Sequence, residues 1–391
     1  MQDPQDLPGA AVKGCSCSVG GSPRDRRADC VAPFASGSTA ARSDLLTWLL
    51  KACLSAPSKG SDKMKTALVF PGQGSQVVGM GKALAEQFPV AHEVFARVDA
   101  ALSQKLSHLM FEGPEAELTL TANAQPALMA VSIAALRALE QEAGFDPAQD
   151  AEFVAGHSLG EYSALCAAGA LTLEDTARLL RLRGDAMQKA VPVGEGAMAA
   201  LIGLDFGKAV RISTEAAREF HLQGAICQAA NDNGGGQVVI SGTKQAVERA
   251  MELAKREGAK RAILLPVSAP FHCALMRPAA EAMRAALRDI AIKAPNPPLV
   301  SNVAARPIDD PDAIRKGLVE QVTGTVRWRE SVLYMSGEGV TRFIEVGSGK
   351  VLAGLVKRIS EGVTATSIGT PADISVFAAA EAGRQTTKPG E

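Results

Sequence analysis

A serine flanked by glycines interrupts the stretch FVAGHSLGEYSALCAAGAL, residues 153–171. An apolar, strand-like run ends at Gly156, and an alanine-rich helical stretch follows Gly160. A strand, a Gly-x-Ser-x-Gly turn and a helix make up a nucleophile elbow, in which the sharp turn projects the serine and the glycines let neighbouring chains approach. The pattern predicts that Ser158 is a nucleophile. The alternative is a serine that only caps a helix.

A serine hydroxyl needs a base to be a good nucleophile, and the sequence contains five histidines. His157 adjoins Ser158, and because adjacent side chains usually diverge we expect it to pack beneath the turn. His272 ends RAILLPVSAPFH, a buried strand followed by a Pro-containing turn, which is typical of the carboxyl edge of a sheet. We therefore predict that His272 is the base, although no acidic residue that would orient it is evident. Surface positions are expected for the rest: His92, His108 and His221.

Elements that would hold these residues begin at Met64, where KTALVF predicts a strand, PGQGSQ a turn and VVGMGKALAEQF a helix. Further on, EFVAG, PPLVSNV and TRFIEVG predict strands, and several amphipathic or apolar stretches predict helices. Strands that alternate with helices indicate an α/β fold with a mainly parallel sheet that is covered on both faces.

The order of elements changes between residues 194 and 267, where the pattern is β, α, β, β, α, β. That order is typical of a ferredoxin-like unit. We expect a ferredoxin-like subdomain at 194–267, inserted in a discontinuous core made of 64–193 and 268–382. A flexible tail is expected at 383–391.

Residues 1–63 are rich in Ser, Pro, Arg and Gly, contain no glutamate and show no sustained hydrophobic period. We expect a mostly disordered amino-terminal extension. Its apolar stretch LLTWLLKACL is too short to span a bilayer. A targeting segment is the alternative.

Composition limits the partners. A formal net charge of -1 and 4% aromatic residues offer no general attraction to nucleic acid or to an anionic membrane. The seven cysteines show no CxxC pair, which favours a reducing, cytoplasmic location and gives no support for a metal site. GSGKVL and PGQGSQ lack the spacing of phosphate-binding and dinucleotide-binding loops, so we expect no cofactor.

Six stretches occur in an order that resembles malonyl-CoA:acyl carrier protein transacylases: FPGQGSQVVGMG, GHSLGEYSAL, RGDAMQKAVP, GQVVISG, PVSAPFHCALM and FIEVGSGKVLAGL. The resemblance extends from Met64 to about Ala382. It implies an α/β-hydrolase-like core with a ferredoxin-like subdomain, and it implies transfer of a malonyl group from malonyl-CoA to the phosphopantetheine thiol of acyl carrier protein, for fatty acid biosynthesis. We expect a monomer.

The resemblance also assigns roles to residues. It places the nucleophile at Ser158 and the base at His272, and it implies that a main-chain carbonyl, that of Gln321, orients the imidazole. Four further positions follow from it: the backbone N–H groups of Gln73 and Leu159 as the oxyanion hole, Arg183 as the partner of the malonyl carboxylate, and Asn231 near the substrate.

Taken without the resemblance, Arg183 at the end of an amphipathic helix is more often a solvated charge, and the Asn231 segment NDNGGG is a good turn sequence. Two other functions stay open: a serine hydrolase on the same elbow, and a noncatalytic protein that binds the carrier. Basic residues near the cleft would help an acidic carrier to dock, and we name three candidates: Lys350, Lys357 and Arg358.

Overall fold

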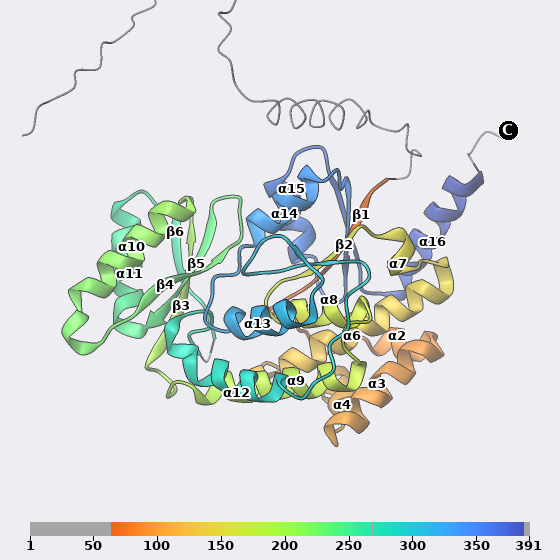
Figure 1. Ribbon diagram of the computed structural model, residues 1–391, viewed down its shortest axis with the longest axis horizontal. Helices are drawn as coiled ribbons and strands as arrows, with labels where there is room; N and C mark the ends of the chain where they lie inside the picture. The colour runs from red at the N-terminus through yellow and green to blue at the C-terminus, as the bar shows by residue number, and fades with distance from the viewer. Residues whose placement is uncertain (1–63, 268, 387–391) are drawn as a thin grey trace, which may run out of the picture. The chain divides into compact units, whose positions relative to one another are not determined.

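The computed structural model describes residues 64–267 and 269–386. The predicted extension at 1–63 lies outside the described residues, as do residues 387–391 of the predicted tail. Helix α16 (Pro371–Thr386) runs into the stretch 383–391 for which a tail is expected. Two sheets, each with its own helices, make up the described part of the chain (Figure 1).

The larger sheet has six strands. In spatial order these are β10 (Thr364–Ile368), β9 (Arg342–Val346), β1 (Thr66–Phe70), β2 (Phe153–Gly156), β7 (Leu299–Val300) and β8 (Pro307–Ile308). Neighbouring strands pair in parallel, except that β7 and β8 are antiparallel. The structure confirms the expectation of a mainly parallel sheet.

Successive side chains of β1 point to opposite faces of this sheet, and each face packs into its own apolar core. Leu68 and Phe70 belong to one apolar cluster, together with residues of α6, α8 and α9. Ala67 and Val69 belong to the other, together with residues of α14 and α15. All four side chains are fully buried, because both faces of the sheet are covered by helices.

The helices around the larger sheet are α2 (Lys82–Gln87), α3 (Pro89–Leu102), α4 (Leu106–Glu112), α5 (Glu115–Leu118), α6 (Thr121–Ala143), α7 (Pro147–Asp150), α8 (Gly160–Ala167), α9 (Leu173–Lys189), α12 (Arg277–Leu287), α13 (Pro311–Gln321), α14 (Trp328–Gly337), α15 (Val351–Ile359) and α16. The helix expected over residues 77–88 begins only at Lys82. Gly79 and Gly81 have φ angles of 93° and 81°. A helix cannot continue through these left-handed conformations.

The smaller sheet has four antiparallel strands in the spatial order β4 (Cys227–Asp232), β5 (Gln237–Thr243), β3 (Gly196–Ile202) and β6 (Arg261–Leu264). Helices α10 (Phe206–Glu219) and α11 (Lys244–Arg256) supply the apolar side chains of its separate core. The sequence order β, α, β, β, α, β confirms the ferredoxin-like prediction. The boundaries at 194 and 267 stay predictions. Short 3₁₀ turns follow α10 and precede α12: η1 (His221–Gln223) and η2 (Ala274–Met276).

Strand β4 joins the smaller sheet to the segment between α13 and α14. The backbone N–H of Asp232 donates to the carbonyl of Val326 at 2.9 Å, and the N–H of Val326 donates to Ala230 at 2.8 Å. The Asp232 carboxylate also pairs with Arg329 at 2.8 Å. The edge of the smaller sheet is therefore tied to the larger unit by backbone hydrogen bonds and by one ion pair.

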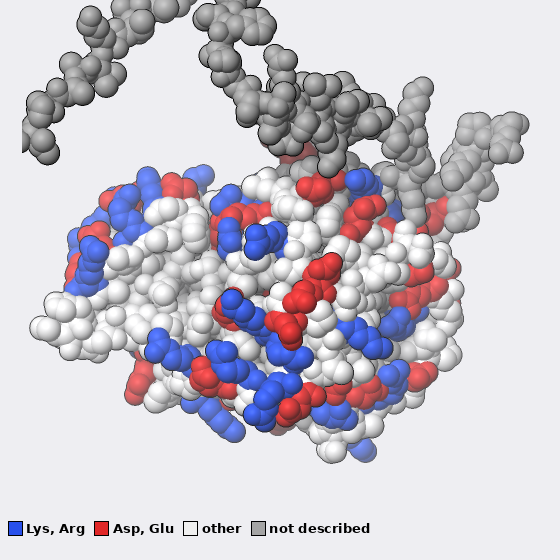
Figure 2. All heavy atoms as spheres, viewed as in Figure 1, with Lys and Arg blue, Asp and Glu red and all other residues white. Residues whose placement is uncertain are grey.

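Charges of both signs are interspersed over the face drawn in Figure 2, as a net charge of -1 suggests. Within residues 64–267 and 269–386, each helix is either too short or too polar to cross a membrane.

Candidate active site

Ser158 lies in a tight turn between β2 and α8, with a φ angle of 55°. Such left-handed backbone is uncommon for a residue that is not glycine. The glycines on either side permit it. A Cβ atom at Gly156 would lie 1.9 Å from the backbone of Gly160, and one at Gly160 would lie 2.2 Å from the carbonyl oxygen of Phe70. The turn is therefore packed so closely that larger residues at these two positions would force it apart.

Asn302 holds the turn from the next strand. Its Oδ1 accepts the backbone N–H of Ser158 at 2.8 Å, and its Nδ2 donates to the carbonyl of Gly156 at 2.6 Å. Asn302 follows β7 at the carboxyl end of the sheet, where side chains from neighbouring parallel strands meet. The strained backbone of Ser158 is thus supported by an amide side chain that is 144 residues away in the sequence.

The imidazole of His272 lies beside Ser158, although the prediction of a buried strand before it is wrong: β6 is a partly exposed edge strand of the smaller sheet. The imidazole Nε2 is 2.7 Å from Ser158 Oγ, and its Nδ1 is 2.8 Å from the backbone oxygen of Gln321. A carbonyl can only accept, so Nδ1 carries the hydrogen and the lone pair of Nε2 faces the hydroxyl. Burial and the charge of Arg183 lower the pKa of His272 to about 3, so the ring is neutral near pH 7 and its Nε2 lone pair is unprotonated.

Arg183 enters the site from α9 and is 1% exposed. Its Nη1 donates to Gln125 Oε1 at 2.8 Å, and its Nη2 donates to Gln321 Oε1 at 2.8 Å and to Ser158 Oγ at 3.2 Å. Its Nε has no hydrogen-bond partner among the described residues. Burial lowers the pKa of Arg183. The ordinary pKa of arginine is so high that the guanidinium nevertheless stays charged near pH 7. The guanidinium is held by neutral amides, so its positive charge can still attract an anion.

The side chain of Gln321 connects these groups to a buried carboxylate. Its Nε2 donates to the carbonyl of Ser158 at 2.9 Å and to Glu161 Oε2. Glu161 Oε1 accepts the backbone N–H of Asn302 at 3.1 Å. Burial raises the pKa of Glu161 to about 7, and these N–H donors partly oppose the rise.

The two residues expected to form an oxyanion hole lie beside the turn. Leu159 follows Ser158 directly, and Gln73 lies in the loop after β1, whose Gly72 is so close to the turn that a Cβ atom there would be 2.8 Å from the carbonyl of His157. Among the hydrogen bonds of the described residues, the backbone N–H groups of Gln73 and Leu159 have no protein acceptor. Both groups are therefore available to a substrate oxygen.

Asn231 is the predicted site residue that the structure does not join to the others. It lies in β4, is 6% exposed and pairs with Val326 through its backbone. No hydrogen bond within residues 64–267 and 269–386 links its side chain to Ser158, His272 or Arg183. Instead, Oδ1 of Asn233, two residues further on, accepts from His157 Nε2 at 2.9 Å.

The other histidines are separate from Ser158. The His157 ring packs beside Trp328, with 5.8 Å between the ring centroids. Exposed positions are taken by three: His92, His108 and His221. In the described part of the chain, no group of three or more His, Cys, Asp or Glu residues is arranged to hold a metal ion.

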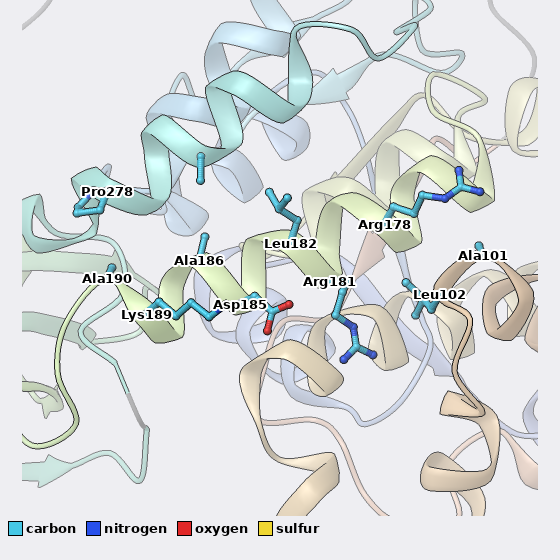
Figure 3. A pocket seen from close by; sticks show the side chains of 11 residues that line it. Ala101, Leu102, Arg178, Arg181, Leu182, Asp185, Ala186, Lys189, Ala190 and Pro278 are labelled. Carbon is cyan, nitrogen blue, oxygen red and sulfur yellow. The ribbon is translucent and has the colours of Figure 1, made fainter.

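A pocket of about 660 Å³ lies on the opposite side of α9 from Arg183 and is lined by residues of α3, α9 and α12 (Figure 3). Arg181, Leu182 and Asp185 are among the residues that line it. None of the hydrogen bonds around Ser158 involves its described lining residues. The candidate site is therefore the Ser158 turn and not this pocket.

Three residues of the site are absent from the sequence predictions: Gln125, Glu161 and Asn302. Glu161 was visible in GHSLGEYSAL, three positions after Ser158, on the helix that the elbow begins. Asn302 follows the predicted strand PPLVSNV, which was a signal for a position at the carboxyl edge. Gln125, inside a long apolar helix, carries the weaker signal of a polar residue in a buried stretch.

The chain is similar to a protein family and to curated proteins. The acyl transferase domain family matches residues 67–374. The malonyl CoA-acyl carrier protein transacylase of Bacillus subtilis strain 168 is 49% identical over 312 residues, which cover 80% of this chain and 96% of that protein. The protein of the same name from Escherichia coli K12 is 48% identical and is covered to 96%.

Solved structures are equally similar. The acyl-carrier-protein-S-malonyltransferase of Bartonella henselae is 57% identical with a TM-score of 0.78, over 82% of this chain and all of that one. A malonyl-transacylase solved in complex with a type II PKS acyl-carrier protein is 44% identical with a TM-score of 0.76, over 81% of this chain and 99% of the other. The chain therefore belongs to the acyl transferase domain family and, within it, to the malonyl CoA-acyl carrier protein transacylases.

Proposed function

We propose that Ser158 carries the malonyl group as an ester while this transacylase moves it from malonyl-CoA to the phosphopantetheine thiol of an acyl carrier protein, so that malonyl carrier protein is supplied for fatty acid biosynthesis. The observation that carries the proposal is the 2.7 Å contact between Ser158 Oγ and a neutral His272 Nε2, beside the buried charge of Arg183.

In the first step His272 Nε2 takes the proton of the Ser158 hydroxyl while Oγ attacks the thioester carbonyl carbon. The negative charge that develops on the carbonyl oxygen is stabilised by the N–H groups of Gln73 and Leu159, by about 3 kcal/mol for each donor. The carbon–sulfur bond then breaks, and the imidazolium returns its proton to the departing thiolate of coenzyme A. The Gln321 carbonyl keeps the imidazole in the required tautomer throughout.

The second step is the reverse exchange with a new thiol. The thiol of the carrier gives its proton to His272 Nε2 and attacks the malonyl ester. Ser158 Oγ leaves and regains a proton from the imidazolium. Because coenzyme A and the carrier end in the same pantetheine thiol, one site serves both steps and ping-pong kinetics follow.

Arg183 selects the acyl group in this scheme. The malonyl carboxylate would pair with the guanidinium, whose planar fork matches a carboxylate in a way that lysine cannot. In the free enzyme Arg183 Nη2 donates to Ser158 Oγ at 3.2 Å, so the carboxylate would replace a weak contact and not a buried ion pair. Asn231, in β4, would lie near the substrate and the base.

The carrier protein would approach through basic residues. Carrier proteins of this family are typically acidic, and three exposed residues near α15 offer positive charge: Lys350, Lys357 and Arg358. The similar malonyl-transacylase solved with an acyl-carrier protein supports such a partner. We expect the chain to act as a monomer.

Intact-protein mass spectrometry after incubation with malonyl-CoA tests the proposal. We expect a malonyl adduct on Ser158 that persists without a thiol acceptor and disappears when holo acyl carrier protein is added. Rapid release of malonate to water would instead indicate a hydrolase. The absence of any adduct would indicate a protein that only binds the carrier.

A further inference from the structure

Glu161 is a buried carboxylate that the scheme above does not use. It lies in the first turn of α8, three residues after Ser158, and is 1% exposed. Within the described part of the chain, no Lys or Arg side chain donates a hydrogen bond to this carboxylate. Its two oxygens instead accept from two different segments: Oε1 accepts the backbone N–H of Asn302, and Oε2 accepts Nε2 of Gln321.

Both of these donors also hold the reacting pair, and Gln321 contacts both of its members, since its Nε2 donates to the Ser158 carbonyl at 2.9 Å. Asn302 accepts the backbone N–H of Ser158 at 2.8 Å and so holds the nucleophile. Gln321 accepts from His272 Nδ1 through its backbone oxygen at 2.8 Å and so holds the base. The two donors lie on different elements: Asn302 follows β7, and Gln321 is the last residue of α13. Only 3.4 Å separates Gln321 Nε2 from Asn302 Oδ1, so the two supports meet at the carboxylate.

We propose that Glu161 is a positioning residue: by binding both Asn302 and Gln321, it fixes the position of Ser158 relative to His272. The proposal rests on the function proposed above, because it concerns the distance between Ser158 Oγ and His272 Nε2 during acylation. Transfer between these atoms falls steeply when their alignment is lost.

The chemistry of the group favours a carboxylate over an amide here. An ionised carboxylate only accepts, at both oxygens, and two N–H donors point at it. A glutamine at this position would turn an NH₂ group toward one of those donors, so one of the two supports would lose its partner. Burial raises the pKa of Glu161 to about 7. The test is therefore made at pH 8, where the carboxylate is mostly charged.

The test compares single-turnover malonylation of the wild type and of Glu161→Gln at pH 8, by rapid quenching and intact mass, over a range of malonyl-CoA concentrations. We expect the maximal acylation rate to fall about 10- to 100-fold, since one or two hydrogen bonds to a charged group are lost. The half-saturating concentration should stay within about twofold, because Glu161 does not touch the substrate.

Glu345→Gln is the matched control. Glu345 is equally buried, and its carboxylate accepts the backbone N–H groups of Leu352 and Ala353 at 3.0 and 2.9 Å. The same substitution there should lower the melting temperature without lowering the acylation rate of the folded protein. An equal fall in rate for both variants would show a general loss of structure and overturn the proposal.

Two more variants keep the test decisive. Gln321→Ala removes one of the two donors and keeps the backbone carbonyl. In this background Glu161→Gln should lower the acylation rate by a smaller factor than in the wild type, and fully additive effects would overturn the coupling. If Glu161→Gln does not fold, Glu161→Asp carries the test, with a rate about tenfold lower expected because its oxygens are withdrawn. An unchanged rate overturns the proposal, whereas a wild type that forms no adduct overturns the proposed function itself.

Discussion

The six-stranded and four-stranded sheets contribute to the site in different ways. Ser158 and Asn302 follow strands of the parallel sheet, and Arg183 and Gln321 come from helices that cover it. The antiparallel sheet contributes through the segments that follow two of its strands: His272 lies between β6 and η2, and Asn233, which directly follows β4, contacts His157. Parallel strands direct their following loops to one edge, so distant residues converge there, whereas an antiparallel sheet sends its loops to both ends. We infer that the larger unit performs the chemistry and that the smaller one forms a wall.

The largest expected effect is in the parallel-sheet unit. Ser158→Ala should abolish the malonyl adduct and lower transfer to the carrier about 10⁴-fold or more, because Ser158 Oγ is the only hydroxyl within hydrogen-bond distance of His272 Nε2 among the described residues. Intact mass and a carrier-loading assay measure this. Ser163→Ala, on the following helix α8, changes a buried hydroxyl that has no partner among the described residues and should leave the adduct unchanged. A full adduct in Ser158→Ala would show that the nucleophile lies elsewhere.

Substitution of the buried arginine should alter selectivity. Arg183→Ala is expected to lower kcat/KM for malonyl-CoA about 100-fold. The kcat/KM for acetyl-CoA should change little, because its acyl group has no carboxylate to pair with the guanidinium. Arg181→Ala is the control on the same helix, because this side chain donates to Asn123 and Gln104 and, among the described residues, makes no hydrogen bond to Ser158 or His272. The ratio of the two kcat/KM values measures the effect, and an unchanged ratio would exclude Arg183 as the partner of the carboxylate.

A third prediction concerns acid stability. The pKa of His272 is about 3 in the folded chain, against 6.5 for an ordinary histidine. As the pH falls from 7 to 4, the unfolded chain therefore takes up a proton that the folded chain refuses, and the free energy of unfolding should decrease by about 3 kcal/mol for this reason. His272→Gln should lack that part of the decrease. Urea unfolding at several pH values measures it, and parallel curves for the two proteins would contradict the buried, neutral state.

The smallest effect is expected at the junction of the two sheets. Arg329→Ala leaves the Asp232 carboxylate, which is 2% exposed, without its cation and should lower the free energy of unfolding by about 1 to 2 kcal/mol. The acylation rate should change by less than about twofold, because the wall does not react. Arg249→Ala, on α11, removes the ion pairs with Glu219 and Glu252 and should lower the free energy of unfolding less than Arg329→Ala does. A large loss of acylation rate in Arg329→Ala would make the smaller sheet part of the chemistry.

Sequence predictions succeed here where the signal is local. The elbow is a run of five residues between a strand and a helix, and the ferredoxin-like order can be followed element by element. Edge strand β10 was not predicted, because TATSI is polar, and neither was β8, which has two residues. An edge strand needs less apolar surface than a buried one, so hydrophobic periodicity does not reveal it.

The site itself divides along the same line. Ser158 and His272 were chosen from residue chemistry, and the structure brings them within 2.7 Å. Gln321 came only from the family resemblance, because a backbone carbonyl carries no side-chain signal. Asn302 and Glu161 were missed, since an amide and a carboxylate that serve other residues form no motif along the chain. Their contacts exist only after the sheet is assembled.

The two glycines beside Ser158 reverse the usual relation between chemical importance and replaceability. Neither has a functional group, yet a single methyl group on either would collide with backbone at 1.9 to 2.2 Å, and backbone cannot rotate out of the way as a side chain can. The nucleophile can be exchanged for another small residue and leave a folded, inactive chain. An alanine scan would therefore rank Gly156 and Gly160 as the least tolerant positions of the turn, ahead of the serine that does the chemistry.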